Sequence, residues 1–422
     1  MCVDIVIRNT SEVVTVAGDP SGPADQALAA IPRGAVGIIG ARVAFLGPEN
    51  ELPSDAVGPE TKLIDAGGGF VGPGFVDPHT HLVFAGERSR EFDLRCQGKS
   101  YVELAQASGG IASTMRATRA ASETELMNGA RARLRRLMEH GVLVAEVKSG
   151  YGLDVEDELK MLKIVHRLQG AQPVTLVPTL LCAHAIPPEY EERRGEYVDL
   201  CVDEIIPKVA QQKLAVFCDA FVERSAFTAE EGRRILEAGR AAGLVPRLHA
   251  DQLSDGGGAA LAAELGAATA DHLEHVNDAG IEAMAKAGVS AVLVPTSTLF
   301  LRQRQYAPGR KLRDAGVNVA LGTNVNPGSA MTENLPLALG LACLENGLTA
   351  SEAYLAATRG AAIALRLEQA GRLKVNEPAD LVVFGCKGPG HLPYHLGMNH
   401  VRWVIKGGDV VVHRDGDSHV CE

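Results

Sequence analysis

Short apolar segments bounded by Gly, Pro or Asp occur at both ends of the chain and predict small β-strands. The N-terminal segments, which we expect to form an antiparallel sheet, lie at 3–7, 13–16, 36–39, 43–46 and 62–65. The segments near the other end lie at 380–384, 401–405 and 410–412. Because the two ends of a domain often lie close together, we expect both sets of strands to build one small β-sandwich domain.

The middle of the chain alternates between short apolar segments and longer stretches rich in Ala, Glu, Leu and Arg. Stretches such as 156–168 and 229–242 are typical of helices, and the alternation predicts an α/β fold with a parallel sheet. The strand candidates are 74–76, 142–147, 175–179, 215–219, 245–250, 268–272, 291–295 and 317–322. Eight strands fit a closed (β/α)8 TIM-like barrel better than an open sheet. The predicted domains are therefore a barrel at 71–370 and a sandwich built from 1–70 and 371–422.

Composition and charge narrow the class of protein. With 422 residues, 46% of them hydrophobic, the chain is long enough for one large domain and a smaller one. The formal net charge of -11 argues against a nucleic-acid-binding surface. The basic residues Arg131, Arg133, Arg135 and Arg136 are expected to form a solvated helix face. The sequence contains neither an apolar run of the ~20 residues that a membrane span needs nor a Gly-rich phosphate loop.

The eight cysteines are scattered from Cys2 to Cys421, and none forms a Cys-x-x-Cys pair. A chain of this size does not need disulfide bonds, so reduced thiols are expected. The N-terminal segment has an early acid, Asp4, and no long apolar run, which is not typical of a signal peptide. We therefore expect a cytoplasmic protein.

Histidines recur where the predicted strands end, which is where barrel enzymes carry their catalytic groups. His79 and His81 follow the first strand and, being two residues apart, are expected to point to the same side. Two converging imidazoles are good ligands for a transition metal. The other histidines at strand ends are His184, His249 and His272. One such histidine is more often a buried core residue, but five in these positions indicate a site.

Several motifs accompany these histidines. They lie at 77–82, at 95–98 together with Tyr101, and at 109–111, 116–119, 146–152, 249–252, 326–328, 392–397 and 399–401. With this set the chain resembles the amidohydrolase superfamily and, more narrowly, its imidazolonepropionase family. The resemblance runs nearly end to end, and the set is much more specific than the His-x-His pair alone.

The resemblance implies hydrolysis of a small molecule, 4-imidazolone-5-propanoate, to N-formimidoyl-L-glutamate, by a homodimer. It implies that His79, His81 and His249 hold one zinc or iron ion, which would make a water more acidic and polarise the ring carbonyl. The implied substrate-contacting residues are Arg88, Tyr151, His184, Gln252, Asn326, Gly328 and Ser329. It also makes His184 and His272 neutral hydrogen-bond donors or proton carriers near the scissile bond.

The sequence departs from the family pattern after the eighth strand. The family places an aspartate there as metal ligand and base, and this chain has Asn324. A neutral amide offers a weak oxygen ligand and cannot act as a base, and losing a general base typically costs ~10²–10⁴ in rate. Three hypotheses stay open: a substitution made to trap a substrate complex, a natural enzyme whose proton acceptor has moved to His272 or His184, and an impaired binding protein.

Two further positions, Gln252 and Lys148, lie close to the predicted site residues in the sequence. Gln252 stands where the family also has glutamate; either accepts a hydrogen bond from a ring N–H, but only glutamate could take the proton. Lys148 is interpreted as an ion-pair residue near the site and not as a bridge between two metals.

The alternative functions are another cyclic-amide hydrolase or aminohydrolase of the superfamily, and a non-catalytic small-molecule-binding homologue. Recognition of a carboxylate tail distinguishes the first, and metal content with turnover distinguishes the second.

Overall fold

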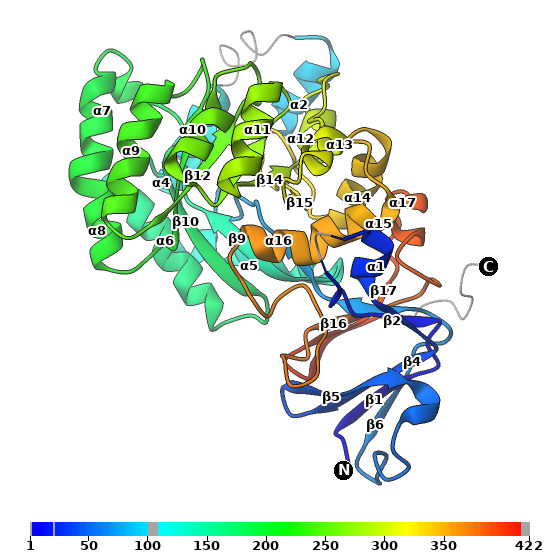
Figure 1. Cartoon of the computed structure of the whole chain (residues 1–422). Helices are drawn as coiled ribbons and strands as arrows, with labels where there is room; N and C mark the ends of the chain where they lie inside the picture. Colours follow the sequence, from blue (N-terminus) through cyan, green and yellow to red (C-terminus); the bar gives the residue numbers. More distant parts are fainter. Residues whose placement is uncertain (1, 20–21, 100–108, 415–422) are drawn as a thin grey trace.

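Eight parallel strands form a barrel in the order of the chain, as the sequence predicts (Figure 1). The computed structural model describes residues 2–19, 22–99 and 109–414, so Tyr101 and Cys421 lie outside the described residues. The barrel strands are β8 (Phe75–Asp77), β9 (Val142–Lys148), β10 (Thr175–Ala183), β11 (Phe217–Val222), β12 (Val245–Ala250), β13 (Thr269–His272), β14 (Ser290–Leu293) and β15 (Val319–Leu321). Each of the eight strand predictions is confirmed, with shifts at the ends.

The first and last barrel strands are joined by hydrogen bonds at and just beyond their carboxyl ends. The carboxylate of Asp77 accepts from the hydroxyl of Thr323 (2.6 Å) and from its backbone N–H (3.1 Å). One residue further, the N–H of Asn324 donates to the carbonyl of His79 (2.9 Å). These bonds close the barrel and keep the segment after β8 extended along its mouth.

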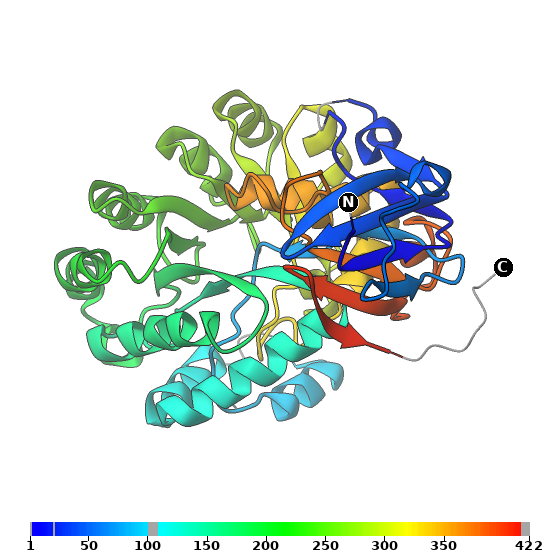
Figure 2. The ribbon, with the colours of Figure 1, turned by 90° about the horizontal axis from the view of Figure 1, so that it is seen from below.

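Helices surround the barrel on the outside (Figure 2). They are α2 (Ser89–Cys96), α4 (Gly110–Ala120), α5 (Glu123–Glu139), α6 (Val155–Gln169), α7 (Arg194–Leu200), α8 (Ile206–Gln211), α9 (Ala229–Ala241), α10 (Gly258–Leu265), α11 (Asp278–Ala287), α12 (Pro295–Phe300), α13 (Gly309–Asp314), α14 (Leu335–Leu344), α15 (Ala350–Leu355) and α16 (Ala361–Ala364). The helices predicted at 156–168 and 229–242 are α6 and α9. Pro295 opens α12 and does not belong to a strand, because proline fits the first helical turn. In the described part of the chain, no helix is long and apolar enough to cross a membrane.

The basic residues of α5 differ in part from the expected solvated face. Arg135 and Arg136 pair with acids at the surface, as expected. Arg133 is instead partly buried: its Nη1 donates to the carbonyl of Leu82 (2.8 Å), and its guanidinium lies 3.4 Å from the ring centroid of Phe84. Burial lowers the pKa of Arg133 to about 10. The chain entering the site after β8 is therefore fixed to α5 by this side chain.

The two ends of the chain share a sheet, as predicted. One sheet has the order β5-β4-β1-β6 and the other the order β18-β17-β16-β7-β2-β3, where β16 pairs antiparallel with β7. The strands are β1 (Ile5–Arg8), β2 (Glu12–Val14), β3 (Ala30–Pro32), β4 (Gly34–Ile39), β5 (Arg42–Pro48), β6 (Lys62–Asp65), β7 (Val71–Pro73), β16 (Leu381–Phe384), β17 (Val401–Lys406) and β18 (Asp409–His413). One buried cluster links both sheets through residues such as Ile7, Val36, Val71 and Leu381. The domain boundaries at 70 and 371 stay predictions.

The prediction of a purely antiparallel N-terminal sheet is wrong. β6 runs parallel to β1, because the chain passes through four other strands before it returns to the free edge of β1. The short strands β3 and β7 and the helix α1 (Ala24–Leu28) were not predicted. Three-residue strands carry too few alternating positions to stand out in a sequence. The remaining short elements are η1 (Glu49–Glu51), η2 (Pro188–Tyr190), η3 (Cys201–Ile205), η4 (Ala356–Gly360) and α17 (His391–Tyr394).

Candidate metal centre and substrate cavity

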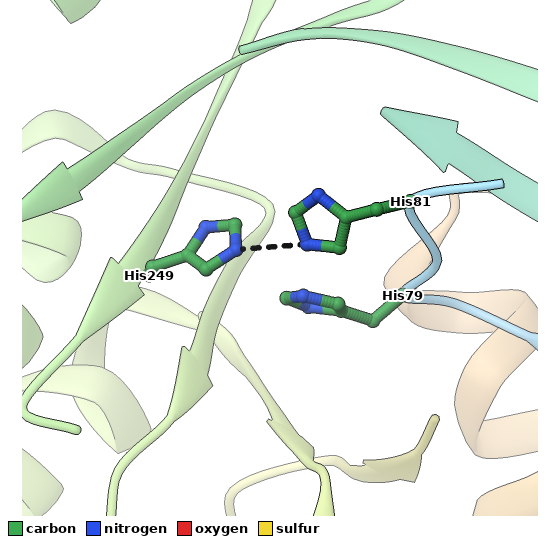
Figure 3. A group of neighbouring side chains, drawn as sticks. All are labelled: His79, His81 and His249. Carbon is green, nitrogen blue, oxygen red and sulfur yellow. Dashed lines mark hydrogen bonds between the residues drawn. The ribbon is translucent and has the colours of Figure 1, made fainter. Parts of the chain in front are cut away.

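Three histidines converge at the carboxyl ends of the barrel strands (Figure 3). His79, His81 and His249 are buried, and one nitrogen of each lies within 4.8 Å of the others. His249 belongs to β12, whereas His79 and His81 lie beyond the end of β8. They still point to one side, because the backbone stays extended: the N–H of His81 donates to the carbonyl of Val325 (3.0 Å). The five histidines predicted at strand ends thus come from four strands.

Two aspartates orient two of these imidazoles. His79 Nδ1 lies 2.6 Å from Asp271 Oδ2, and His249 Nδ1 lies 3.1 Å from Asp219 Oδ1. Because a carboxylate only accepts, each Nδ1 carries the hydrogen and each Nε2 keeps a lone pair. The sequence analysis missed both aspartates. The signal was present, since an acid in the middle of a buried apolar strand needs a partner.

The charges beneath the histidines are paired. Lys148 Nζ donates to Glu146 (2.9 Å) and to Asp219 (2.7 Å), and Arg247 donates to Asp271 (2.8 Å). All five side chains are fully buried, so each charge depends on its partners. The interpretation of Lys148 as an ion-pair residue is confirmed.

The three histidines fit a metal ion. Burial lowers the pKa of each imidazole well below its usual value, and the nearby charge of Lys148 lowers it further, so the rings are neutral at pH 7. Among the described residues, the buried His79 Nε2 has no hydrogen-bond partner. His81 Nε2 and His249 Nε2 lie 3.5 Å apart. Because the aspartates direct the Nε2 lone pairs of His79 and His249 toward this point, the three neutral imidazoles form a ligand set for zinc or another transition metal.

A cavity of about 680 Å³ opens beside the histidines. It collects residues from loops that are far apart in the sequence, which the barrel brings to one face. The predicted site residues that line it are His81, Arg88, Tyr151, His184, His249, Gln252, His272, Asn324, Asn326, Gly328 and Ser329. His79 is the one predicted residue outside this lining, and it is fully buried.

One turn after β9 positions both Tyr151 and His184. The carboxylate of Glu158 on α6 accepts from the backbone N–H groups of Gly150, Gly152 and Leu153 at 2.9–3.0 Å. The carbonyl of Gly150 lies 2.9 Å from His184 Nδ1 and can only accept, so His184 Nε2 is an acceptor. Which of its two expected roles His184 takes, hydrogen-bond donor or proton carrier, stays a prediction. Sequence analysis missed Glu158.

The backbone after β13 and β15 adopts left-handed conformations. The φ angle is 80° at His272, 71° at the following Leu273 and 53° at Asn324; this region is uncommon for L residues, and Asn and His adopt it more readily than a residue such as Leu273. Such conformations cluster at functional sites. The His272 ring lies 5.4 Å from that of His79, between centroids. The side-chain oxygen of Asn324 accepts from Asn326 Nδ2 (3.1 Å).

Arg88 lies opposite the turn at 326–329. Asn326 Oδ1 shapes the turn by accepting from the backbone N–H groups of Gly328 and Ser329, both at 2.8 Å. A Cβ atom at position 328 would lie 2.3 Å from Arg88 Nη1, so any residue other than glycine would require the guanidinium to shift from this position. The guanidinium of Arg88 therefore lies between α2 and this turn, where a ligand carboxylate can reach it.

Comparison with known proteins places the chain in a family. The family model for the amidohydrolases matches residues 104–412, and the chain belongs to that family. Within it the chain belongs with the imidazolonepropionases. Imidazolonepropionase from Myxococcus xanthus is 65% identical over 410 residues, 97% of each chain, and that from Geobacillus kaustophilus is 45% identical over 99% of each chain. The family resemblance inferred from the motifs is confirmed.

Solved structures agree on the fold. A 5-methylcytosine deaminase from Klebsiella pneumoniae, liganded with 5-fluorocytosine, aligns with a TM-score of 0.75 at 16% identity and covers 99% of both chains. An adenosine deaminase from Xanthomonas campestris with bound zinc aligns with a TM-score of 0.69 at 18% identity, over 99% of this chain and 95% of that one. At these identities the likeness concerns the barrel and the terminal sheets.

Proposed function

We propose that this protein hydrolyses 4-imidazolone-5-propanoate to N-formimidoyl-L-glutamate in histidine degradation. In this reaction the water oxygen adds to the ring carbonyl carbon, the adjacent C–N bond breaks, and the leaving nitrogen takes a proton. One observation carries the proposal: the three converging imidazoles lie at the cavity that Arg88 also lines, with His81 and His249 in its wall. The imidazoles suit a metal-assisted hydrolysis, and Arg88 suits a propionate tail.

We propose that His79, His81 and His249 hold a single zinc or iron ion, with Asn324 as a weak oxygen ligand. Such an ion, when bound, supplies a Lewis acid that polarises the ring carbonyl and makes a bound water more acidic. The fixed tautomers of His79 and His249 support this assignment, because they direct Nε2 lone pairs toward one point. Elemental analysis of the purified protein distinguishes zinc from iron.

The substrate contacts follow from donors and acceptors. Arg88 binds the tail carboxylate with charge-assisted hydrogen bonds. Burial raises the pKa of Tyr151 far above its usual value, so the phenol stays protonated and can donate. Gln252 accepts from a ring N–H. The Asn326 side chain and the Gly328 and Ser329 backbone shape the turn against which the tail lies.

The proton of the attacking water needs an acceptor other than Asn324. Burial lowers the pKa of His184 to about 4, so His184 is neutral at pH 7 and its Nε2 is an open acceptor on the cavity side. His272 lies beside His79 and lines the same cavity. We propose that one of these two imidazoles takes the proton and returns it to the leaving nitrogen.

The test is turnover of the metal-loaded protein on 4-imidazolone-5-propanoate, followed by loss of its ultraviolet absorbance, with metal measured in the same sample. Steady turnover supports the proposal and shows that Asn324 permits proton transfer. Binding without turnover keeps the substrate and favours the non-catalytic homologue. Neither binding nor turnover, with metal present, rejects the substrate and favours another cyclic-amide hydrolase or aminohydrolase of the family.

We also propose that the protein is a cytoplasmic homodimer without a nucleic-acid partner. The net charge of -11 supports the last point. Exposed apolar side chains on α14, on α17 and on the segment after α17 support a dimer, since such surfaces mark contacts with other proteins. They are Leu344 (68% exposed), Tyr394 (80%), Leu396 (50%) and Met398 (52%). Light scattering of the purified protein gives the mass, and a monomer would reject the dimer.

A further inference from the structure

We propose that Glu91 is a positioning residue that determines specificity for a substrate with a single carboxylate tail, by fixing the orientation of Arg88. This inference rests on the proposed function, because it assigns the tail to Arg88. No sequence motif singled out Glu91, which lies on α2, three residues after Arg88. It lines the cavity and is only 4% exposed.

Glu91 occupies one edge of the Arg88 guanidinium. Arg88 Nε donates to Glu91 Oε2 (2.9 Å) and Arg88 Nη2 donates to Oε1 (2.5 Å), which is a parallel two-point pair. A guanidinium has five N–H donors, and among the described residues Arg88 donates to Glu91 alone. The Nη1–Nη2 edge is therefore the edge that remains for a second carboxylate, while Gly328 packs against the flat face of the guanidinium beside Nη1.

The same carboxylate connects Arg88 to the opposite wall of the cavity. Arg95 Nη2 donates to Glu91 Oε1 (3.2 Å) and to the carbonyl of Gly328 (3.2 Å). The Arg95 guanidinium also lies 5.5 Å from the ring centroid of Phe300, which restricts it further. Glu91 thus fixes Arg88 relative to the turn at 326–329, and the two walls of the tail subsite keep a constant separation.

The remaining donors of Arg88 predict its selectivity. Arg88 and Arg95 both pair with the carboxylate of Glu91. A carboxylate tail can accept from the remaining edge of Arg88, whereas an uncharged tail leaves those N–H donors without an acceptor in a partly desolvated site. Without Glu91, Arg88 gains rotamers and loses the orientation that presents a two-point edge. The loss should affect the tail and leave the chemistry at the ring unchanged.

The experiment compares Glu91→Ala and Glu91→Gln with Asp93→Ala and Asp93→Asn. Asp93 lies on the same helix, where its carboxylate accepts a hydrogen bond from Gln97 (2.8 Å) and does not contact Arg88. Its variants therefore make the same change of charge without changing the contacts of Arg88. Each protein is assayed on 4-imidazolone-5-propanoate and on the 4-imidazolone that carries methyl in place of the tail. For Glu91→Ala we expect KM for the tailed substrate to rise about tenfold or more, with kcat within about twofold.

For the tailless compound we expect KM and kcat to stay within about twofold in every variant. Glu91→Gln, which keeps one acceptor oxygen, should fall between wild type and Glu91→Ala. An unchanged or lower KM for the tailed substrate in Glu91→Ala would overturn the proposal, since charge and not orientation would then control binding. Equal losses on both substrates would overturn it as well, because they indicate a general structural role.

A second measurement covers the case in which the tailless compound is not turned over. Imidazole-4-propionate and 4-methylimidazole are then compared as inhibitors of the tailed reaction, and Glu91→Ala should reduce the preference for the propionate about tenfold. An unchanged preference overturns the proposal. If the wild-type protein does not turn over the tailed substrate, the proposed function fails but the role of Glu91 can still be tested. Calorimetry then measures the binding of both imidazoles to each variant.

Discussion

His79 Nδ1 lies 2.6 Å from Asp271 Oδ2, and both side chains are fully buried. Asp271 also accepts from Arg247 (2.8 Å), so one carboxylate orients a candidate metal ligand and compensates a buried cation. The imidazole is thereby held in one tautomer and one orientation. The relationship connects the metal centre to the charged core of the barrel.

Asp271→Asn should weaken metal binding. An amide can accept from Nδ1 but lacks the charge that makes the imidazole a better ligand, and loss of such partners costs about 10–100-fold in affinity. The measurement is competition with a chelator of known affinity on protein shown to be folded by circular dichroism.

The control for that variant is Asp314→Asn, which removes the aspartate of a surface pair with Arg310. It should leave metal affinity at the wild-type value. Wild-type affinity in folded Asp271→Asn would mean that His79 does not bind the metal or is oriented without Asp271.

Asn324→Asp should raise kcat at least about tenfold, because a carboxylate restores the missing base and adds an anionic ligand. The backbone tolerates the change, since Asp and Asn both adopt the positive φ of 53° found there. Turnover is measured at matched metal content. An unchanged rate would mean that the proton goes to another group, and His184→Gln and His272→Gln would then identify which one.

Glu158→Ala should raise KM and lower Tm. It removes the acceptor of three buried backbone N–H groups in the turn that carries Tyr151, and each unsatisfied group costs about 1–3 kcal/mol. Steady-state kinetics and thermal unfolding are the measurements. The matched control is Glu156→Ala in the same helical turn, where the side chain is exposed. A wild-type KM in Glu158→Ala would show that the turn keeps its shape without this carboxylate.

Glu352 should contribute stability that is lost in acid. Burial by itself would raise the pKa of Glu352, but the Thr349 N–H and the guanidinium groups of Arg310 and Arg313 outweigh it and lower the pKa to about 2. Because the folded-state pKa is depressed, the contribution is present above about pH 4.5 and disappears as the pH falls toward 2.

Glu352→Gln should therefore lower the free energy of unfolding by about 1 kcal/mol at pH 7. Near pH 2, where the wild-type carboxylate is also largely protonated, the variant and the wild type should have similar free energies of unfolding. Urea unfolding at several pH values measures both. A deficit of the same size at pH 7 and in acid would show that shape and not charge explains the effect.

The sequence by itself determined the eight barrel strands, the main helices and the histidines of the site. These features depend on local patterns: apolar runs, helical periodicity and a His-x-His pair after a strand. It also determined that the two ends of the chain meet, since both carry strands that need a partner. The family resemblance then supplied the other predicted cavity residues, although it could not supply the geometry.

Only the tertiary structure decided which side chains meet. His79 and Asp271 are 192 residues apart in the chain, and their contact depends on the register of β12 and β13 and on closure of the barrel. Long-range packing also decides the burial of Arg133 and the parallel pairing of β6. The ion pair of Glu91 with Arg88 depends on one rotamer of the arginine. A sequence specifies these through the free energy of the whole fold, and no local window contains that information.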